Sequence, residues 1–337
     1  MAFSHILGHE RQLEVLQRNI KTGQIPPAYL FHGDEGIGKR MAAIEFAKAV
    51  NCGGDLFGEV PCGTCQNCRN IEAGCHPNVS ALALELNQDT GKMRQEIVVK
   101  QVRAAQDFLS LKAVGEGRKV LVVDGAHLMN EESANAFLKT LEEPPDNSHV
   151  ILITSRVASL LPTILSRCRS VSYQPLKEDL VAGLLMEKGI PAADASLVAR
   201  MTGGRVGEAL SADATELRDR RKAFLKTLGA ITEKGPTAVL KAAEEAAKEA
   251  DGLPEFVFFG TMWFRDLLVI LVGGDARTAY NVDIMDKLNG WAGRISPARC
   301  ENALLLLKQA GRSLERTFNR RLLAEDLFFR LREETSA

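Results

Sequence analysis

The sequence has 337 residues, of which 45% are hydrophobic, so two or three domains with sizeable cores are expected. Its 42 Lys and Arg residues are balanced by 43 Asp and Glu residues, and the net charge of -1 excludes a basic field over the whole protein. Any nucleic-acid binding must then come from a local patch or an assembly. No apolar run reaches membrane-spanning length and no leader pattern opens the sequence, so we expect a cytoplasmic protein.

The chain begins with a predicted helix over residues 7–22, a strand over 28–31 and a helix over 41–50. The loop before the second helix reads Gly33-Asp34-Glu35-Gly36-Ile37-Gly38-Lys39-Arg40. Its first seven positions match the loop that surrounds phosphates with backbone N–H groups and a lysine. We predict a P-loop fold, and a glycine-rich turn without a ligand is the alternative. The candidate nucleotide contacts are Gly33, Gly36, Gly38 and Lys39.

The eighth position of this loop departs from the pattern. A Ser or Thr there places a hydroxyl on magnesium, whereas Arg40 has no acceptor and carries the same sign of charge as the metal. We therefore expect ATP and magnesium to be held poorly, with at most weak nucleotide binding through Lys39.

Four of the seven cysteines lie close together after the second helix: Cys52, Cys62, Cys65 and Cys68. Two overlapping C-x-x-C turns and one preceding cysteine supply four thiolates, enough for a closed, structural zinc site. A redox dithiol or unliganded thiols are the alternative. A reducing compartment favours the metal over disulfides. The other three are expected to be small buried side chains outside the site: Cys75, Cys168 and Cys300.

A predicted helix over 95–113 precedes a buried strand over 119–124. P-loop proteins hold a metal-coordinating aspartate at such a strand end, where this chain has Asp124, although Asp-Gly also makes an ordinary turn. The next residue is Gly125, and a glycine cannot polarise an attacking water. The strand end therefore supplies a candidate metal ligand without a catalytic base.

Asn130 is predicted to cap the next helix, which a strand over 149–154 follows. Thr154 at the strand end is placed to contact a terminal phosphate, or else to bond the backbone. A short helix at 162–165 comes next. Strand and helix patterns alternate from 28 to 172, which predicts an α/β domain with a parallel sheet.

From residue 176 onward the patterns are helical only. Two short helices are predicted at 177–188 and 192–201, and a third opens within 203–210. A long helical region over 214–334 has its main stretches at 242–250, 256–272 and 299–331. Acids and bases alternate along the exposed sides, which is typical of solvated helix faces, and no catalytic cluster occurs here.

Four features together carry a resemblance to a known family. They are the phosphate loop with four cysteines after its helix, Val122-Val123-Asp124, the run Ser133-Ala134-Asn135-Ala136-Phe137-Leu138-Lys139-Thr140-Leu141-Glu142-Glu143-Pro144-Pro145, and Ser166-Arg167-Cys168. In this order they resemble the clamp-loader subunits of bacterial DNA polymerase III. The resemblance is strong over about the first 215 residues and beyond them rests on length and helical character.

The resemblance implies an AAA+ P-loop domain at 1–173 with a parallel sheet and an inserted zinc module at about 52–75. A small helical lid domain at 174–213 and an all-helical collar domain at 214–337 would follow. In this family the collar joins five subunits in a ring that uses ATP to open the sliding clamp. The implied partners are the tau/gamma ATPase subunits, the delta subunit and, through the ring, the sliding clamp and primer-template DNA.

The resemblance also gives Arg167 a role. In this family Ser-Arg-Cys carries an arginine finger that reaches the γ-phosphate held by the neighbouring subunit. The alternative is an ion pair with a local carboxylate.

Three departures separate this chain from the ATPase members of the family. Those members have Ser or Thr at the position of Arg40, Glu at that of Gly125 and Arg at that of Gly207. Each such loss costs powers of ten in rate, so we predict negligible hydrolysis. Arg205 is a candidate substitute for the lid arginine. The predicted function is that of a non-hydrolysing stator that lends Arg167 to a neighbouring ATP site.

Two other functions stay open. An ATP-hydrolysing subunit of tau/gamma type, or another AAA+ ATPase, predicts turnover that Lys39→Ala abolishes. A nucleic-acid adaptor would use the cysteine module itself. Residues 52–76 argue against that function because they contain no Lys, one Arg, and no aromatic residue after Phe57.

Overall fold

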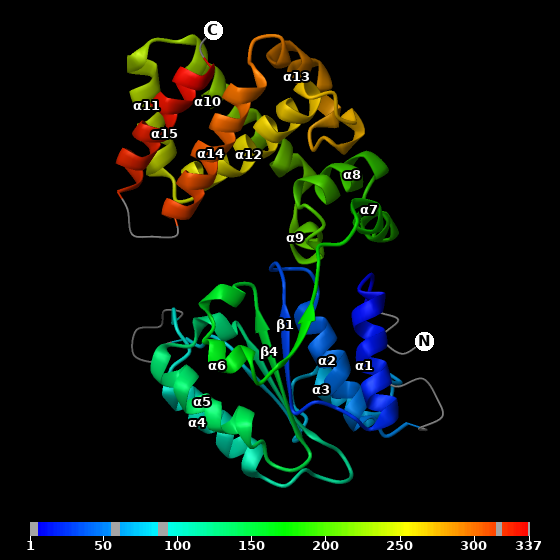
Figure 1. The fold of residues 1–337 in the computed structure, drawn as a ribbon. Helices are drawn as coiled ribbons and strands as arrows, with labels where there is room; N and C mark the ends of the chain where they lie inside the picture. The colour runs from blue at the N-terminus through cyan, green and yellow to red at the C-terminus, as the bar shows by residue number, and fades with distance from the viewer. Residues whose placement is uncertain (1–5, 55–60, 87–93, 315–318, 336–337) are drawn as a thin grey trace. The chain divides into compact units, whose positions relative to one another are not determined.

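The computed structural model describes residues 6–54, 61–86, 94–314 and 319–335. The chain divides into two compact units, Met1–Ser211 and Ala212–Ala337, each of which is described by itself (Figure 1). The finer division into three domains stays a prediction. Within the described residues, no helix has both the length and the apolar character to cross a membrane.

The first unit is built on a parallel sheet, as the alternating pattern predicts, and the sheet has five strands. The strand order is β2-β3-β4-β1-β5. The strands are β1 (Ala28–His32), β2 (Val79–Leu82), β3 (Lys119–Asp124), β4 (Ser148–Thr154) and β5 (Arg169–Ser172). Because all strands are parallel, their carboxyl ends meet at one edge, where α/β proteins bind ligands.

Helices cover both faces of this sheet (Figure 1). One face carries α1 (Glu10–Thr22), α2 (Lys39–Asn51) and α3 (Gln66–Glu72), and the other carries α4 (Val99–Ser110), α5 (Glu131–Glu142) and α6 (Pro162–Leu165). Successive side chains of a strand point to opposite faces. In β1, Tyr29 and Phe31 join the core with α1 and α2, whereas Leu30 joins the core with α4 and α5.

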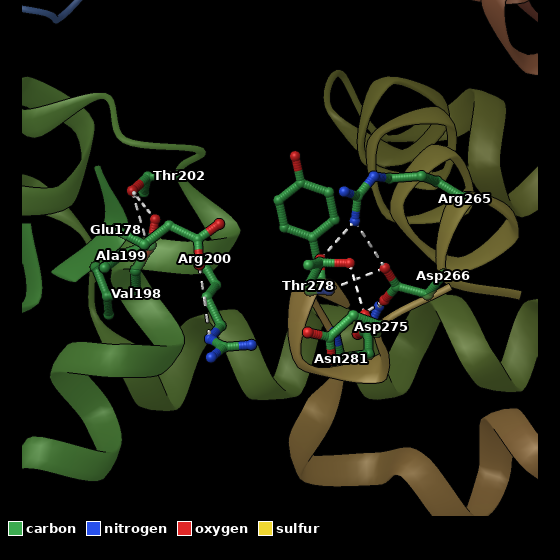
Figure 2. A network of polar contacts seen from close by, with 11 residues as sticks. Glu178, Val198, Ala199, Arg200, Thr202, Arg265, Asp266, Asp275, Thr278 and Asn281 are labelled. Carbon is green, nitrogen blue, oxygen red and sulfur yellow. Dashed lines mark hydrogen bonds and ion pairs between the residues drawn. The ribbon is translucent and has the colours of Figure 1, made fainter. Parts of the chain in front are cut away.

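Three short helices complete the first unit: α7 (Glu178–Glu187), α8 (Ala192–Met201) and α9 (Val206–Ser211). The turn before α9 is tied to the segment before α7, because Leu176 N donates to Gly204 O at 3.1 Å. Gly204 has φ +79°, and a Cβ there would lie 2.0 Å from Leu176 O, so only glycine fits this approach. An ion pair between Arg200 and Glu178 joins α8 to α7 (Figure 2).

The second unit is entirely helical in its described part. Its α-helices are α10 (Ala214–Glu233), α11 (Pro236–Lys248), α12 (Gly252–Leu271), α13 (Met285–Ala292), α14 (Pro297–Leu314) and α15 (Arg320–Thr335). Phe224, Phe256 and Phe328 pack together in its core. The fully buried Asp266 accepts hydrogen bonds from the backbone N–H groups of Tyr280 and Asn281, at 2.9 and 2.8 Å (Figure 2).

The boundaries of two predicted helical segments were wrong. The predicted helix over 95–113 is shorter as α4, because Ile97 forms a bridge with Met129 and Leu111 is extended. The predicted helical stretch 299–331 is divided between α14 and α15, and residues 315–318 lie outside the described part. Strands β2 and β5 and helix α3 were not predicted individually.

Candidate functional site

The predicted phosphate loop lies between β1 and α2, at the carboxyl edge of the sheet. Gly33, Gly36 and Gly38 have φ of +136°, +70° and +97°, which L side chains rarely adopt, so the glycines are required by the backbone. Gly38 precedes the first residue of α2, so the loop opens a helix N-terminus. This geometry is the strand, glycine loop and helix that the sequence predicts.

The Lys39 ammonium is directed back into its own loop. Its Nζ donates to Gly33 O at 2.6 Å and also to Asp34 O, and the residue is 6% exposed. Burial lowers the pKa of Lys39 despite the nearby carboxylate of Glu35. The ammonium therefore uses hydrogen bonds on carbonyl oxygens of its own loop.

Arg40 forms an ion pair with the strand-end aspartate. Its Nη1 lies 3.1 Å from Asp124 Oδ2, with side chains 58% and 32% exposed. A magnesium ion would have to compete with a guanidinium for this carboxylate. The pair is therefore an obstacle to metal binding at Asp124.

The side chains at the end of β4 form hydrogen bonds with neighbouring segments. Thr154 is 1% exposed, and its Oγ1 lies 3.2 Å from His127 Nδ1 and accepts from Arg156 N at 3.0 Å. The second contact is the backbone bond that the sequence left as the alternative for Thr154. Ser155 Oγ donates to Glu35 Oε1 at 3.1 Å, which connects the strand end to the phosphate loop.

Helix α9 closes directly onto the phosphate loop. Gly207 N donates to Gly36 O at 2.7 Å, and a Cβ at Gly207 would lie 3.1 Å from Gly36 Cα and 3.2 Å from its oxygen. Arg205 instead forms an ion pair with Glu208 at 2.7 Å. The position where ATPase members carry an arginine is thus a backbone contact here.

These residues surround a cavity of about 730 Å³. Of the predicted nucleotide contacts, five line it: Gly36, Gly38, Lys39, Asp124 and Thr154. Gly33 and Arg205 are not among its lining residues, and a Cβ at Gly33 would lie 2.3 Å from Tyr173 O. The cavity has the size of a small-molecule site, but its basic groups are engaged with the chain itself.

The four predicted metal ligands come together at the end of α2 and the start of α3. The sulfurs of Cys52, Cys62, Cys65 and Cys68 all lie within 4.8 Å of one another. The Cys52 sulfur is 4.0 Å from that of Cys65 and 3.8 Å from that of Cys68. Tetrahedral zinc with bonds of about 2.3 Å separates its sulfurs by similar distances. The cluster fits a metal such as zinc.

Backbone N–H groups point at these sulfurs, as the short turns predict. Cys65 N donates to Cys62 Sγ at 3.4 Å, and Cys68 N donates to Cys65 Sγ at 3.5 Å. The bonds from the 64–65 backbone lower the pKa of the Cys62 thiol to about 6. These bonds favour the thiolate form of Cys62, which is the form that binds a cation, whereas burial raises the pKa of Cys52 and Cys68.

The remaining cysteines lie outside this cluster. Cys300 is buried, as expected, with its Sγ 3.1 Å from Phe264 O. Cys168 is half-buried, and burial raises its pKa to about 12. The expectation of a buried side chain was wrong for Cys75, which is exposed.

Arg167 follows α6 and does not line the cavity. Its Nη2 lies 2.5 Å from Glu142 Oε1, and its Nη1 donates to Thr163 O at 2.8 Å and to Ser166 Oγ at 3.3 Å. The side chain is still 33% exposed. The pair with Glu142 is the local carboxylate bridge that the sequence left as an alternative.

Sequence reasoning missed several residues of these sites. His127, Glu35 and Ser155 all line the cavity, and Glu142 holds Arg167. His127 stands three residues after Asp124, which is the only signal that could have pointed to it. Burial and the nearby Arg156 lower its pKa and favour the neutral ring.

The family model and the sequence relatives are all described as DNA polymerase III subunits. A family model described as DNA polymerase III, delta subunit, matches residues 8–177. DNA polymerase III subunit delta′ of Bacillus subtilis is 29% identical over 331 residues, which cover 96% of each chain. DNA polymerase III subunit tau of Escherichia coli is 35% identical over 217 residues, which span 62% of this chain and 32% of the relative. A gamma subunit-related protein from Thermotoga maritima is a structural match with TM-score 0.45, 22% identity, and coverage of 96% of this chain and 99% of the other.

Proposed function

The chain belongs to the DNA polymerase III delta subunit family, and from this premise we propose that it is a non-hydrolysing subunit of the clamp loader. It assembles with tau/gamma and delta subunits into the ring that places the sliding clamp on primed DNA. It supplies Arg167 to the ATP site of its neighbour. Similarity over nearly the whole length of a subunit delta′ supports this proposal.

The observation that carries the stator role is the state of the chain's own nucleotide cavity. Arg40 pairs with Asp124, and Gly207 bonds the phosphate loop backbone at Gly36. Gly125 offers no carboxylate for an attacking water. At these three positions the chain lacks the groups that an ATPase uses, which supports the proposal that its own site does not hydrolyse ATP.

The finger role rests on a different part of the same unit. Arg167 lies outside the cavity and keeps a third of its side chain exposed. A guanidinium on the surface can complete an active site in another subunit, where it stabilises the charge of the transferred phosphoryl group.

The four-cysteine cluster is proposed to hold structural zinc. Cys68 is 1% exposed, and the Cys65 sulfur caps the first turn of α3. Four thiolates leave no open position on the metal, so the zinc would supply folding free energy rather than chemistry.

The test is ATP turnover by a reconstituted clamp loader with sliding clamp and primed DNA. We expect Arg167→Ala to lower turnover, since an arginine finger contributes about 10³-fold or more to the step it assists. We expect Lys39→Ala to leave turnover unchanged. If Lys39→Ala is the damaging change, the chain is an ATP-hydrolysing subunit and the proposed role is wrong.

A further inference from the structure

We propose that Glu142 is a positioning residue for Arg167, an inference that rests on the proposed function. The sequence assigns it no role. In the structure it provides the carboxylate that the Arg167 guanidinium contacts, at 2.5 Å from Nη2. Glu142 would hold the guanidinium in the orientation in which it meets the phosphate bound by the neighbouring subunit.

Glu142 lies at a helix end where its negative charge is stabilised by a nearby cation such as Arg167. It is the last residue of α5, where a carboxylate faces the negative end of the helix dipole and is disfavoured. The Arg167 cation offsets this cost. Glu143 ends the helix, and Pro144 and Pro145 after it restrict the backbone and prevent the helix from continuing.

The hydrogen bonds of Arg167 leave one part of the guanidinium available. Its Nη1 is occupied by Thr163 O and Ser166 Oγ, and one Nη2 hydrogen by Glu142. The Nε–H group and the second Nη2 hydrogen have no acceptor among the described residues. A phosphate can be bound by the N–H groups that remain, with the others still in place.

The pair with Glu142 should affect the orientation of the Arg167 guanidinium more than the stability of the fold. An Arg side chain has about 2 kcal/mol of rotamer entropy, and a partly exposed ion pair contributes little to folding. A guanidinium that is already held when the neighbour arrives does not lose that freedom in the transition state. Misplacement of a catalytic group by about 1 Å can cost about 100-fold in rate, so loss of Glu142 should act on turnover.

Glu143 provides a matched control. It is the next residue, it is exposed, and no ion pair joins it to any residue in the described part of the chain. Glu143→Ala removes the same chemical group one position away. Because the Glu142 and Arg167 side chains are 48% and 33% exposed, variants at either position are expected to fold.

The experiment measures ATP turnover by the reconstituted clamp loader with clamp and primed DNA. We expect Glu142→Ala to remove most of the turnover that Arg167→Ala removes, through kcat, with an unchanged KM for ATP. Glu142→Gln keeps an acceptor oxygen without the charge and should lie between Glu142→Ala and wild type. The double variant Glu142→Ala/Arg167→Ala should be no slower than Arg167→Ala alone, because both changes remove one function. Glu143→Ala should match wild type.

Other outcomes would overturn the inference. If Glu142→Ala is as active as wild type or faster, Glu142 does not position the finger. If the losses from the two single variants multiply in the double variant, Glu142 acts by another route. If Arg167→Ala itself leaves turnover unchanged, the proposed function fails together with this inference, whereas a loss in Arg167→Ala without one in Glu142→Ala overturns only the inference.

Discussion

Two arginines of the first unit each lie beside a carboxylate, but with opposite consequences. Arg40 pairs with Asp124 inside the cavity, where the carboxylate would otherwise be available to a metal. Arg167 pairs with Glu142 outside the cavity and keeps hydrogen-bond donors that the pair does not use. In the proposed function, the first pair obstructs a metal site within the chain, and the second orients a group that acts on another chain.

The comparison of these two pairs shows that the presence of an ion pair does not by itself indicate whether a site is functional. Both pairs are partly exposed, so each contributes on the order of 1 kcal/mol or less to folding. What matters is which groups each pair occupies. At Arg40 the pair takes the acceptor that chemistry would need, whereas at Arg167 it leaves the donors that chemistry would use.

Removal of metal from the cysteine cluster should change the cavity and spare Arg167. Cys65 caps the start of α3, and the last residue of this helix, Glu72, lines the cavity and pairs with Lys48. Metal loss by chelation or Cys68→Ser should cost several kcal/mol, since structural zinc is bound with about 10 kcal/mol or more. We expect faster hydrogen exchange in α3 and at Lys48, and unchanged exchange over residues 162–172.

The exposed Cys75 gives the control, because Cys75→Ser should retain zinc content and exchange rates. Equal acceleration around residues 162–172 would show that the two sites are not independent.

The substitution Arg40→Thr should restore a response to magnesium. It frees Asp124 and adds a hydroxyl at the position where the phosphate loop places one on the metal. We expect magnesium to tighten binding of a fluorescent adenine nucleotide about tenfold in the variant and to leave wild type unaffected. Titrations with magnesium and with EDTA measure this, and Arg103→Thr on the exposed surface of α4 is the control. A magnesium response in wild type would contradict the obstructive role of Arg40.

A pH-dependent effect on stability is expected at His149, a basic side chain that is buried and has no acidic partner among the contacts of the described residues. Burial lowers its pKa to about 4, and neutral His149 donates from Nδ1 to Pro26 O at 3.1 Å and accepts from Arg118 at 3.1 Å. The unfolded state, with a pKa near 6.5, binds the proton first as pH falls. Stability should therefore fall by about 1.4 kcal/mol per pH unit between about pH 6.5 and 4.

Urea unfolding at several pH values measures this slope, and His149→Gln should reduce it by one proton. His32→Gln, where burial lowers the pKa less, should change it less. An unaltered slope in His149→Gln would mean that the ring is protonated in the folded state.

The sequence could predict what depends on local pattern. Residue Asn130 caps α5 as predicted, with Oδ1 accepting from Ser133 N at 2.9 Å, and the C-x-x-C turns bring the four sulfurs together. Strand β2 escaped prediction because four residues with half-exposed Val79 and Ser80 carry little periodicity. The ion-pair partners of Arg40 and Arg167 were not predicted either, because the number of charges in a sequence does not show which acidic residue each basic residue contacts in the fold. The bond from Gly207 to Gly36 joins two backbones, and no side-chain pattern encodes it.

The placement of Arg167 has a mechanical consequence. Two residues after it, β5 begins, and four of its residues are in register with β1, from Tyr29↔Arg169 to His32↔Ser172. Strand β1 in turn leads into the phosphate loop. A load applied to Arg167 along β5 is resisted by these four residue pairs in shear, so a displacement there is transmitted to β1, the strand that precedes the phosphate loop.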